Sequence, residues 1–274
     1  MMTIAADFLQ KYGPWALVTG ASSGIGEQFA RQLARQGFNL VLVARRADRL
    51  QTLQTELLQQ HGAKAEVVAE DLGDPAAIDR VLAALAGHDI GLVVSNAGFG
   101  LKGGFNQHAR AELEAMLNVN ARAPLLLLHG LLPQLRARGH AGVILTGSQE
   151  GEAAFPWSSA YAATKAYVHS LGLSLFGELQ GTGVDVLVLA PGSTETEAPL
   201  LQGIRREALF GVMSAEEVAR QGLEQLGRRP LHVPAWYNRV LVHLLRALPR
   251  RWAIAVARQG IAATMEKSGN PVGH

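Results

Sequence analysis

The sequence predicts an α/β protein with one doubly wound parallel sheet, helices on both faces and a helical C-terminal extension. Continuous apolar segments alternate with helical segments, a glycine-rich turn joins the first apolar segment to a helix, and polar residues follow the ends of several apolar segments. The chain has 274 residues, 48% of them hydrophobic, which is enough for one large core. We assign residues 1–235 to the domain and residues 236–274 to the extension.

Composition argues against several other classes of protein. The formal charge is +2, with no long run of one sign, so no nucleic-acid-binding face is predicted. Cysteine is absent and the nine histidines lack zinc-binding spacing, so we expect neither disulfides nor a metal site. The N-terminus does not resemble a signal peptide, and no apolar run is long enough to span a bilayer. We therefore expect a cytoplasmic protein.

The first elements form a strand–helix–strand unit around a glycine-rich turn. An apolar strand at Trp15–Thr19 leads into Gly-Ala-Ser-Ser-Gly-Ile-Gly, and a helix at Glu27–Gln36 and a strand at Asn39–Val43 follow. A helix N-terminus in this position presents unpaired N–H groups and a positive dipole end to a pyrophosphate. The turn residues assigned to nucleotide binding are Gly20, Ser22, Ser23, Gly24, Ile25 and Gly26.

The glycines of this turn have separate roles. Gly20 permits the tight turn, Gly24 lets the backbone approach the pyrophosphate, and Gly26 lets the helix pack close to the sheet. Glycines at this spacing alone also fit an ordinary turn. The strand before them and the helix after them favour the nucleotide site.

The end of the second strand predicts the choice of nicotinamide cofactor. NAD sites usually carry an acid there, whereas arginine accommodates the 2′-phosphate of NADP. This chain has no acid at that point, and Arg45 and Arg46 follow the strand. Guanidinium groups suit bidentate phosphate binding, so we predict NADP. The alternative is that both arginines are only the solvated start of a helix at Ala47–Gln60.

The alternation of strands and helices continues through the domain. Asp74 is expected to cap a helix that runs to Ala86, and Ser214 to open another with a capping box. The other predicted strands are Lys64–Ala69, Ile90–Ser95, Gly142–Thr146 and Val184–Leu189, and the other predicted helices are Ala109–Arg138 and Ser159–Gln180. Ligands bind beyond the carboxyl ends of such strands, so the segments that follow them are expected to meet there.

Tyr161 and Lys165 are four residues apart and share one face of the helix predicted at 159–180. A nearby ammonium group favours the phenolate and lowers the tyrosine pKa, which is ordinarily about 10. The pair can then do general acid–base work near neutral pH. This spacing is common by chance, and its weight comes from the glycine turn, from Asn96-Ala97-Gly98 and from Ser148 upstream.

Taken together, these motifs resemble those of the short-chain dehydrogenase/reductase family over about residues 15–234. The resemblance rests on Thr-Gly-x-x-x-Gly-x-Gly, Asn-Ala-Gly, Tyr-x-x-x-Lys with an upstream serine, and Pro-Gly followed by Thr196. Many members have asparagine where this chain has Ser95, which we expect to hydrogen-bond locally instead. The resemblance implies a Rossmann-type domain and hydride transfer between a nicotinamide cofactor and a substrate.

The resemblance also implies roles for individual residues. Tyr161 would exchange a proton with the substrate oxygen, and Ser148 would hydrogen-bond that oxygen. Lys165 would lower the tyrosine pKa and hold the nicotinamide ribose, and Asn120 would hold a water in a proton relay to Lys165. Asp71 would meet the adenine. The other residues implied to bind the cofactor are Leu72, Asn96, Ala97, Gly98, Pro191, Gly192, Thr194 and Thr196.

We predict an NADP(H)-dependent oxidoreductase acting on an apolar secondary alcohol or ketone. The alternative is a non-catalytic NADP-binding regulatory or interaction protein on the same fold, which the intact Ser148, Tyr161 and Lys165 set disfavours. Glu150 and Glu152 are expected to be solvated, and residues 195–210 to form a mobile lid. The candidates for an apolar substrate wall, or equally for surface packing, are Phe99, Phe155, Pro156 and Trp157.

Apolar residues beyond the needs of one domain predict contacts with a partner. The helices at 109–138 and 159–180 are apolar around more than one face, so we expect a homodimer or homotetramer through them, as the resemblance also implies. The extension carries an apolar stripe with accompanying arginines. We expect it to pack on the domain or a partner subunit, with membrane-surface contact as the less favoured alternative. The stripe comprises Trp236, Val240, Leu241, Leu244, Leu245, Leu248, Trp252, Ile254 and Val256.

Overall fold

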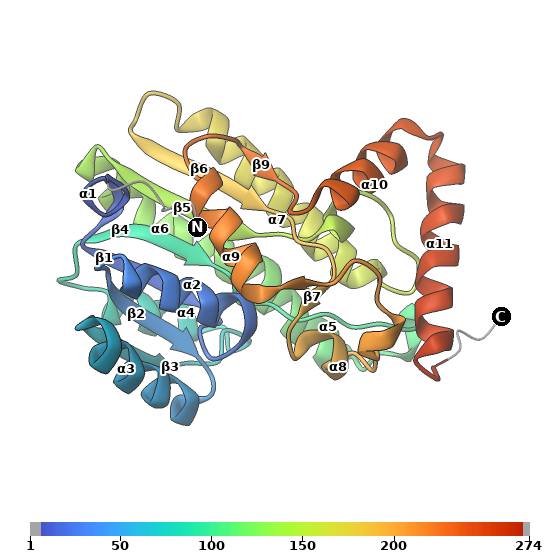
Figure 1. The fold of residues 1–274 in the computed structure, drawn as a ribbon, viewed down its shortest axis with the longest axis horizontal. Helices are drawn as coiled ribbons and strands as arrows, with labels where there is room; N and C mark the ends of the chain where they lie inside the picture. The colour runs from blue at the N-terminus through green and yellow to red at the C-terminus, as the bar shows by residue number, and fades with distance from the viewer. Residues whose placement is uncertain (1–6, 271–274) are drawn as a thin grey trace.

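The computed structural model describes residues 7–270 and shows a parallel sheet between two layers of helices (Figure 1). The seven strands lie in the order β3-β2-β1-β4-β5-β6-β9, and all neighbours in this sheet pair in parallel. The strand order reverses beside β1, which is where open α/β sheets bind ligands. The strands are β1 (Trp15–Thr19), β2 (Asn39–Ala44), β3 (Ala65–Ala69), β4 (Ile90–Ser95), β5 (Ala141–Thr146), β6 (Val184–Leu189) and β9 (Leu231–His232), with a separate pair β7 (Thr194–Glu195) and β8 (Met213–Ser214).

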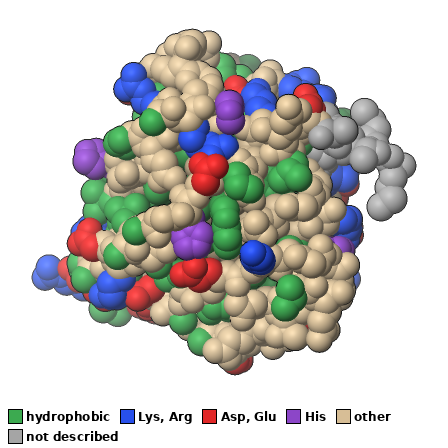
Figure 2. All heavy atoms as spheres, turned by 90° about the vertical axis from the view of Figure 1, so that its left-hand side faces the viewer, with side chains coloured by type: hydrophobic (Ala, Val, Ile, Leu, Met, Phe, Trp, Pro, Cys, Tyr) green, Lys and Arg blue, Asp and Glu red, His purple; other side chains and the backbone are tan. Residues whose placement is uncertain are grey.

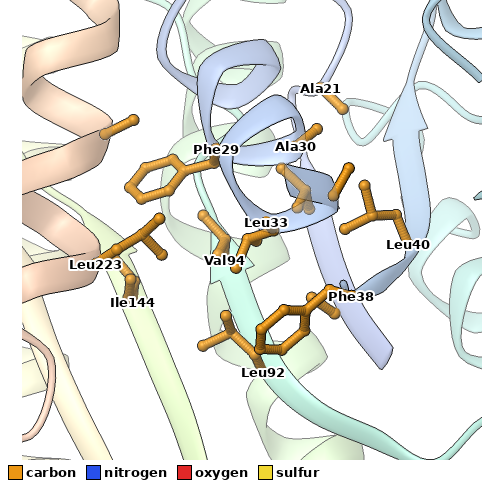
Figure 3. Close-up of a cluster of buried hydrophobic side chains, with 14 of the residues drawn as sticks. Ala21, Phe29, Ala30, Leu33, Phe38, Leu40, Leu92, Val94, Ile144 and Leu223 are labelled. Atoms are coloured by element: carbon orange, nitrogen blue, oxygen red, sulfur yellow. The ribbon is translucent and has the colours of Figure 1, made fainter. Parts of the chain in front are cut away.

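One face of the sheet packs against a core formed with α1 (Phe8–Tyr12), α2 (Gly24–Arg35), α3 (Ala47–His61) and α9 (Ala215–Gln225). Figure 3 shows Phe29 and Leu33 of α2 meeting Leu223 of α9 above Val94 and Ile144 of the sheet. These side chains are almost fully buried. Burial of such a side chain contributes roughly 1.5–3 kcal/mol to stability, so this cluster fixes α2 against the sheet. The N-terminus of α2, which follows the glycine turn, is thereby held in place.

The opposite face is covered by α4 (Ala77–Ala84), α6 (Ala123–Arg138) and α7 (Ser159–Glu178), whose Val81, Leu127 and Val168 are buried against the strands. The helix α5 (Arg110–Leu117) leads into α6 through one wider π turn, Asn118–Arg122. The predicted helix at 109–138 is therefore continuous but irregular. Such turns re-aim a side chain, and this one carries Asn120 inward, where it is 1% exposed.

One predicted helix start is wrong. Asp74 does not cap α4, because α4 begins at Ala77 and Ala76 occupies the cap position. The Asp74 carboxylate instead accepts the Ala76 N–H at 3.1 Å and pairs with Arg80, which stabilises a turn ahead of the helix. Ser214 accepts the Glu217 N–H at 3.1 Å and caps α9 as expected. The short edge strand β9 and the β7–β8 pair were not predicted, because two-residue strands carry no periodicity.

The extension forms α10 (Trp236–Ala247) and α11 (Arg250–Lys267), which stand with α8 (Ala198–Leu201) beyond the carboxyl ends of the strands (Figure 1). The helices turn Leu245, Ala253 and Ala257 toward Phe155 of the domain. Most members of the apolar stripe stay exposed: Trp236 is 70% exposed and Leu244 58%. The domain therefore leaves most of the stripe uncovered, and of its members only Leu245 is buried. Packing of the stripe on a partner subunit stays a prediction.

Residues 7–270 contain neither a membrane-spanning helix nor a cluster of metal ligands. None of the helices in this range has the length and apolar character needed to cross a bilayer. In the same range no cluster of histidine and carboxylate side chains is arranged to hold a metal ion. On the side of the molecule away from α11, acidic and basic side chains are interspersed (Figure 2). That side presents no continuous basic face.

Candidate active site

A pocket of about 900 Å³ lies beyond the carboxyl ends of the strands. One end is bounded by the glycine turn and the residues after β2 and β3. The other end is bounded by α10 and α11, while α8 begins next to Glu197, which pairs with Arg46 at the first end. Ser148, Tyr161 and Lys165 line the pocket between these ends. An elongated ligand could therefore reach from the glycine turn to the tyrosine.

Close backbone approach explains the glycines of the turn. Gly20 and Gly24 have φ values of 69° and 58°, which favour glycine. A Cβ atom on Gly26 would lie 2.2 Å from the Gly20 carbonyl oxygen, so α2 could not begin where it does. A Cβ atom on Gly24 would lie 2.9 Å from the Thr196 methyl carbon. The turn backbone therefore leaves no room for a side chain at Gly26, and Thr196 leaves none at Gly24.

The loop after β4 is joined to this turn by Thr19. The Thr19 hydroxyl oxygen accepts the N–H groups of Asn96 and Ala97, each at 3.0 Å, and the Asn96 amide donates back to the Thr19 carbonyl at 3.2 Å. Gly98 follows, and a Cβ atom there would lie 3.1 Å from the Asn120 amide oxygen and 3.2 Å from Lys165 Nζ. These contacts set the Asn96–Gly98 backbone along the wall of the pocket.

Arginines gather where β2 ends. Arg46 donates to the hydroxyls of Ser22 and Ser23 at 3.1 and 2.7 Å, and both Arg46 and Arg49 pair with Glu197, at 2.8 and 2.6 Å. These two guanidinium groups, Arg46 first, lower the pKa of Glu197 to about 2. The Arg45 side chain is 69% exposed, and its guanidinium lies 3.9 Å from the Asp71 carboxylate. Arg46 and Arg49 thus form a cationic site whose guanidinium groups are both paired with the Glu197 carboxylate.

The catalytic candidates occupy a buried environment. Lys165 is 4% exposed, and its ammonium group donates to the Thr146 carbonyl at 2.8 Å. Burial lowers the pKa of Lys165 to about 8. The pKa of Tyr161 is raised, mainly by burial and then by the Glu150 charge, while a hydrogen bond from Ser148 acts in the opposite direction. The expected lowering by Lys165 is therefore not found, and the lysine nitrogen lies 5.8 Å from the tyrosine ring centre.

Asn120 holds the loop that follows Asn96–Gly98. Its amide nitrogen donates to the Phe99 carbonyl at 2.8 Å and to the Thr164 hydroxyl at 3.0 Å, and its oxygen accepts the Phe99 N–H at 3.0 Å. Both amide hydrogens are thus used within the protein. The side chain fixes Phe99 next to the site, and the proton-relay role stays a prediction.

The substrate end of the pocket combines an apolar wall with one buried ion pair. Lys102 is paired at 2.7 Å with Glu150, and it also donates to the buried Ser158 hydroxyl at 2.7 Å. Its side chain is only 7% exposed and its nitrogen lies 5.5 Å from the Tyr161 ring centre. The apolar lining includes Phe99, Leu101, Phe155, Leu209, Leu245 and Ile261.

Two polar atoms of residues that line the pocket are buried without a hydrogen-bond partner in the described part of the chain. They are the Thr146 hydroxyl oxygen and the Gln149 amide oxygen, and both residues line the pocket beside Pro191 and Gly192. Buried polar groups normally have partners, so these atoms suit a polar ligand group. This fits a nicotinamide carboxamide or ribose between the glycine turn and Tyr161.

Comparisons with known proteins agree with this geometry. Residues 14–203 match the family model described as short chain dehydrogenase. The chain belongs to the short-chain dehydrogenase family. It is 32% identical over 250 residues to a 7beta-hydroxysteroid dehydrogenase of Clostridium sardiniense, covering 91% of this chain and 96% of that protein.

Solved structures give the same result. A structure described as giving insights into 7beta-hydroxysteroid dehydrogenase stereoselectivity superposes with a TM-score of 0.85 at 30% identity, covering 91% of this chain and 98% of that one. A short-chain dehydrogenase from Sphingobium yanoikuyae in complex with NADPH superposes with a TM-score of 0.78 at 31% identity, covering 86% and 96%. This short-chain dehydrogenase is therefore an oxidoreductase of the nicotinamide-dependent type.

The structure brings nearly all predicted site residues of this short-chain dehydrogenase to one pocket. Gly26 and Asn120 are the exceptions and lie behind its wall, where they hold the turn and the Phe99 loop. Pro156 and Trp157 are also not among the lining residues in the described range. Trp157 instead lies under Arg258 of α11, 5.4 Å from its ring centre.

Sequence reasoning missed or misread several charged residues of the site. Arg49 could have been found, because it lies in the first turn of the helix, three positions after its N-cap residue Arg46. Nothing in the sequence pairs Lys102 with Glu150, or Glu197 with the arginines. The expectation that Glu150 and Glu152 are solvated is wrong: their side chains are 16% and 5% exposed, because Lys102 and His169 pair with them.

Proposed function

We propose that this enzyme transfers hydride between NADP(H) and a bulky, apolar ketone or secondary alcohol. The observation that carries the proposal is one continuous pocket. It joins Arg46, through Tyr161 and Ser148, to a chamber walled by apolar side chains. Arginine at the end of the second strand suits a 2′-phosphate, and an acid suited to a 2′-hydroxyl is absent from that strand end.

The residues present fit the proposed cofactor. Ser22, Ser23 and Arg46 would hold the 2′-phosphate, the N-terminus of α2 the pyrophosphate, and Lys165 the nicotinamide ribose. When bound, the nicotinamide supplies or accepts the hydride. Glu197 would compete with the 2′-phosphate for Arg46. Cofactor binding would therefore require Glu197 to separate from Arg46, by a movement of the segment that follows β7.

Tyr161 and Ser148 would act on the substrate oxygen. The raised pKa of Tyr161 keeps its hydroxyl protonated at neutral pH, ready to donate to a carbonyl oxygen as that oxygen gains charge. Ser148 would donate a second hydrogen bond to the same oxygen and stabilise the developing charge. Because both hydroxyl groups are then hydrogen-bond donors, ketone reduction is the direction to assay first.

The apolar chamber supports a rigid, largely hydrocarbon substrate. Leu101, Phe155, Leu245 and Ile261 come from three separate parts of the chain and surround the space next to Tyr161. A relative that covers 91% of this chain is named for a hydroxysteroid. A polycyclic ketone is therefore the first probe, with small aliphatic ketones for comparison.

The direct test is a carbonyl panel with NADPH and NADH, followed by loss of cofactor absorbance. We expect turnover of bulky polycyclic ketones with NADPH and much slower turnover of small ketones. Absence of turnover on the whole panel, with NADPH binding intact by calorimetry, would contradict the catalytic proposal. Equal affinity for NADPH and NADH would contradict the cofactor assignment.

We also propose a homodimer or homotetramer through α6 and α7. Leu125 of α6 and Tyr167 and Leu173 of α7 are 38–39% exposed although both helices already bury another face against the sheet. Light scattering at micromolar concentration should give a multiple of the 29.2 kDa chain mass. The Tyr167→Glu, Leu173→Glu variant should shift toward the monomer, and a monomeric wild type would refute the proposal.

A further inference from the structure

Behind the catalytic serine lies a second polar group, in which the buried side chains of His169 of α7 and Glu152 meet the exposed Arg246 of α10. His169 follows Lys165 by one helical turn and is 4% exposed. The Ser148 backbone N–H donates to His169 Nε2 at 3.3 Å, and His169 Nδ1 lies 2.5 Å from a Glu152 oxygen. The other Glu152 oxygen is 3.2 Å from the Arg246 guanidinium.

The backbone is shaped to admit the imidazole ring. A Cβ atom on Gly147 would lie 2.2 Å from His169 Nε2, and one on Gly151 would lie 3.0 Å from the same atom. Neither glycine has a positive φ, so local conformation does not require glycine at these positions. The ring of His169 excludes a side chain at Gly147 and occupies a slot between Gly147 and Gly151. At Gly151 the Lys165 backbone is the nearer obstacle, since a Cβ atom there would lie 2.8 Å from its carbonyl carbon.

The contacts define the state of the histidine. Because an amide N–H donates to Nε2, that nitrogen carries the lone pair, and the ring proton lies on Nδ1 facing Glu152. The lone pair of Nε2 is therefore occupied and cannot accept a proton from the serine hydroxyl. Ser148 Oγ meanwhile accepts the Glu150 N–H at 3.1 Å, which leaves its own hydrogen free to donate toward Tyr161 or a substrate oxygen.

We propose that Glu152 and His169 are positioning residues that hold Ser148 for catalysis, and that Arg246 joins this pair to the C-terminal extension. Glu152 orients the ring, the ring fixes the serine amide, and the serine hydroxyl then points at the substrate oxygen. Within residues 7–270 the pocket lining does not include Glu152 or His169, so they act through Ser148. The link also ties α10, whose Leu245 bounds the substrate chamber, to the reacting centre.

The test compares variants that keep or remove the acceptor atom. His169→Phe keeps a ring in the glycine slot but loses both nitrogens, while His169→Gln offers an amide oxygen to the Ser148 N–H. This inference rests on the proposed ketone reduction, so kcat and KM are measured with NADPH and the best ketone of the panel. A small displacement of a catalytic group can cost about 100-fold in rate, so we expect kcat to fall roughly 10–100-fold in His169→Phe.

The pattern across variants separates positioning from a general packing role. His169→Gln should recover most of kcat, and all folded variants should keep the wild-type NADPH affinity. His169→Phe should melt at a lower temperature, because it leaves the buried Glu152 carboxylate without its imidazole partner. Arg246→Met, at an exposed side chain, should lower kcat in the same direction but less. Wild-type kcat in folded His169→Phe, or a loss of NADPH affinity as large as the loss of kcat, would overturn the proposal.

A second measurement does not depend on turnover. In ¹⁵N-labelled protein the His169 imidazole signals are identified by their loss in His169→Gln. We expect a neutral ring with its proton on Nδ1. A proton on Nε2, alone or in a doubly protonated ring, would overturn the positioning role, because Nε2 could not then accept from Ser148. An enzyme inactive on every ketone contradicts only the proposed function, and the tautomer still decides this inference.

Discussion

The two ends of the pocket are built in different ways. The cofactor end is formed by backbone: the glycine turn closes on itself, and Thr19 ties the Asn96 loop to that turn with hydrogen bonds of 3.0 Å. The substrate end is formed by side chains from α10, α11 and the residue 99–102 loop. A backbone wall tolerates no added atom, whereas an apolar side-chain wall can change size and still fold.

This difference suggests which property each end controls. Replacing Gly26 would force the helix off the turn, because a Cβ atom would lie 2.2 Å from a backbone oxygen. Replacing a chamber residue changes the shape that the substrate meets and leaves the turn intact. Cofactor binding and substrate choice should therefore respond to separate sets of substitutions, with Ser148, Tyr161 and Lys165 between them.

The largest expected effect on turnover is at Tyr161, which lies between the two ends of the pocket. Tyr161→Phe removes only the hydroxyl, and general acid–base catalysis is typically worth about 10²–10⁴-fold, so turnover should fall by roughly that factor. NADPH affinity should hardly change, because the ring still packs. Steady-state kinetics and calorimetry on the same sample check both statements. Retained turnover would remove Tyr161 from the mechanism.

At the cofactor end, Arg46→Ala should weaken NADPH binding and leave NADH binding nearly unchanged. Loss of a charge-assisted phosphate contact costs about 1.5–3 kcal/mol, or roughly 10–150-fold in Kd. Arg45→Ala is the matched control, and it should have a smaller effect because Arg45 is more exposed. If the Kd values of NADPH and NADH rise equally in Arg46→Ala, Arg46 does not bind the 2′-phosphate.

At the substrate end, Ile261→Trp should reduce kcat/KM for polycyclic ketones by at least about tenfold while small ketones are little affected. Ile261 bounds the chamber from α11, and differences of one methylene in an apolar pocket are worth about 1–3 kcal/mol. NADPH affinity is the control and should stay constant. A parallel loss of cofactor affinity would show that the two ends are not independent.

A pH effect should appear in cofactor binding. Because burial lowers the pKa of Lys165 to about 8, the side chain is cationic below that pH and neutral above it. Loss of one charged hydrogen bond to the ribose should weaken NADPH binding by about tenfold as pH rises from 7 to 9. Lys165→Met should bind more weakly and without this dependence. A wild-type Kd for NADPH that is constant from pH 7 to pH 9 would show that Lys165 does not change its charge in this range.

The smallest effect should come from Glu197→Gln. This change removes the carboxylate that pairs with Arg46 and Arg49, so NADPH should bind a few-fold more tightly, in line with the modest worth of exposed ion pairs. High salt should narrow the difference between variant and wild type. Weaker binding in the variant would mean that Glu197 supports the cofactor site rather than competing for it.

Much of the fold and the cofactor end could be predicted from local sequence. Strand β1, the turn after it and α2 are consecutive, and each glycine is required by a conformation or contact within that unit or close to it. Tyr161 and Lys165 share a helix face by spacing alone. The strands at 90–95 and 184–189 were predicted with their observed bounds, because buried parallel strands are continuous apolar runs.

Only the tertiary structure decided the charged and apolar partners that lie far apart in the chain. Glu197 meets Arg46 across 151 positions, Lys102 meets Glu150 across 48, and His169 reaches Ser148 across 21. A glutamate with no obvious partner in the sequence is predicted to be solvated, because charged residues are rarely buried unless they are paired. The sequence does not show which distant residue will be the partner. Periodicity predicted a helical apolar stripe in the extension, but packing against Phe155 decided which face α10 and α11 bury and left most of the stripe exposed.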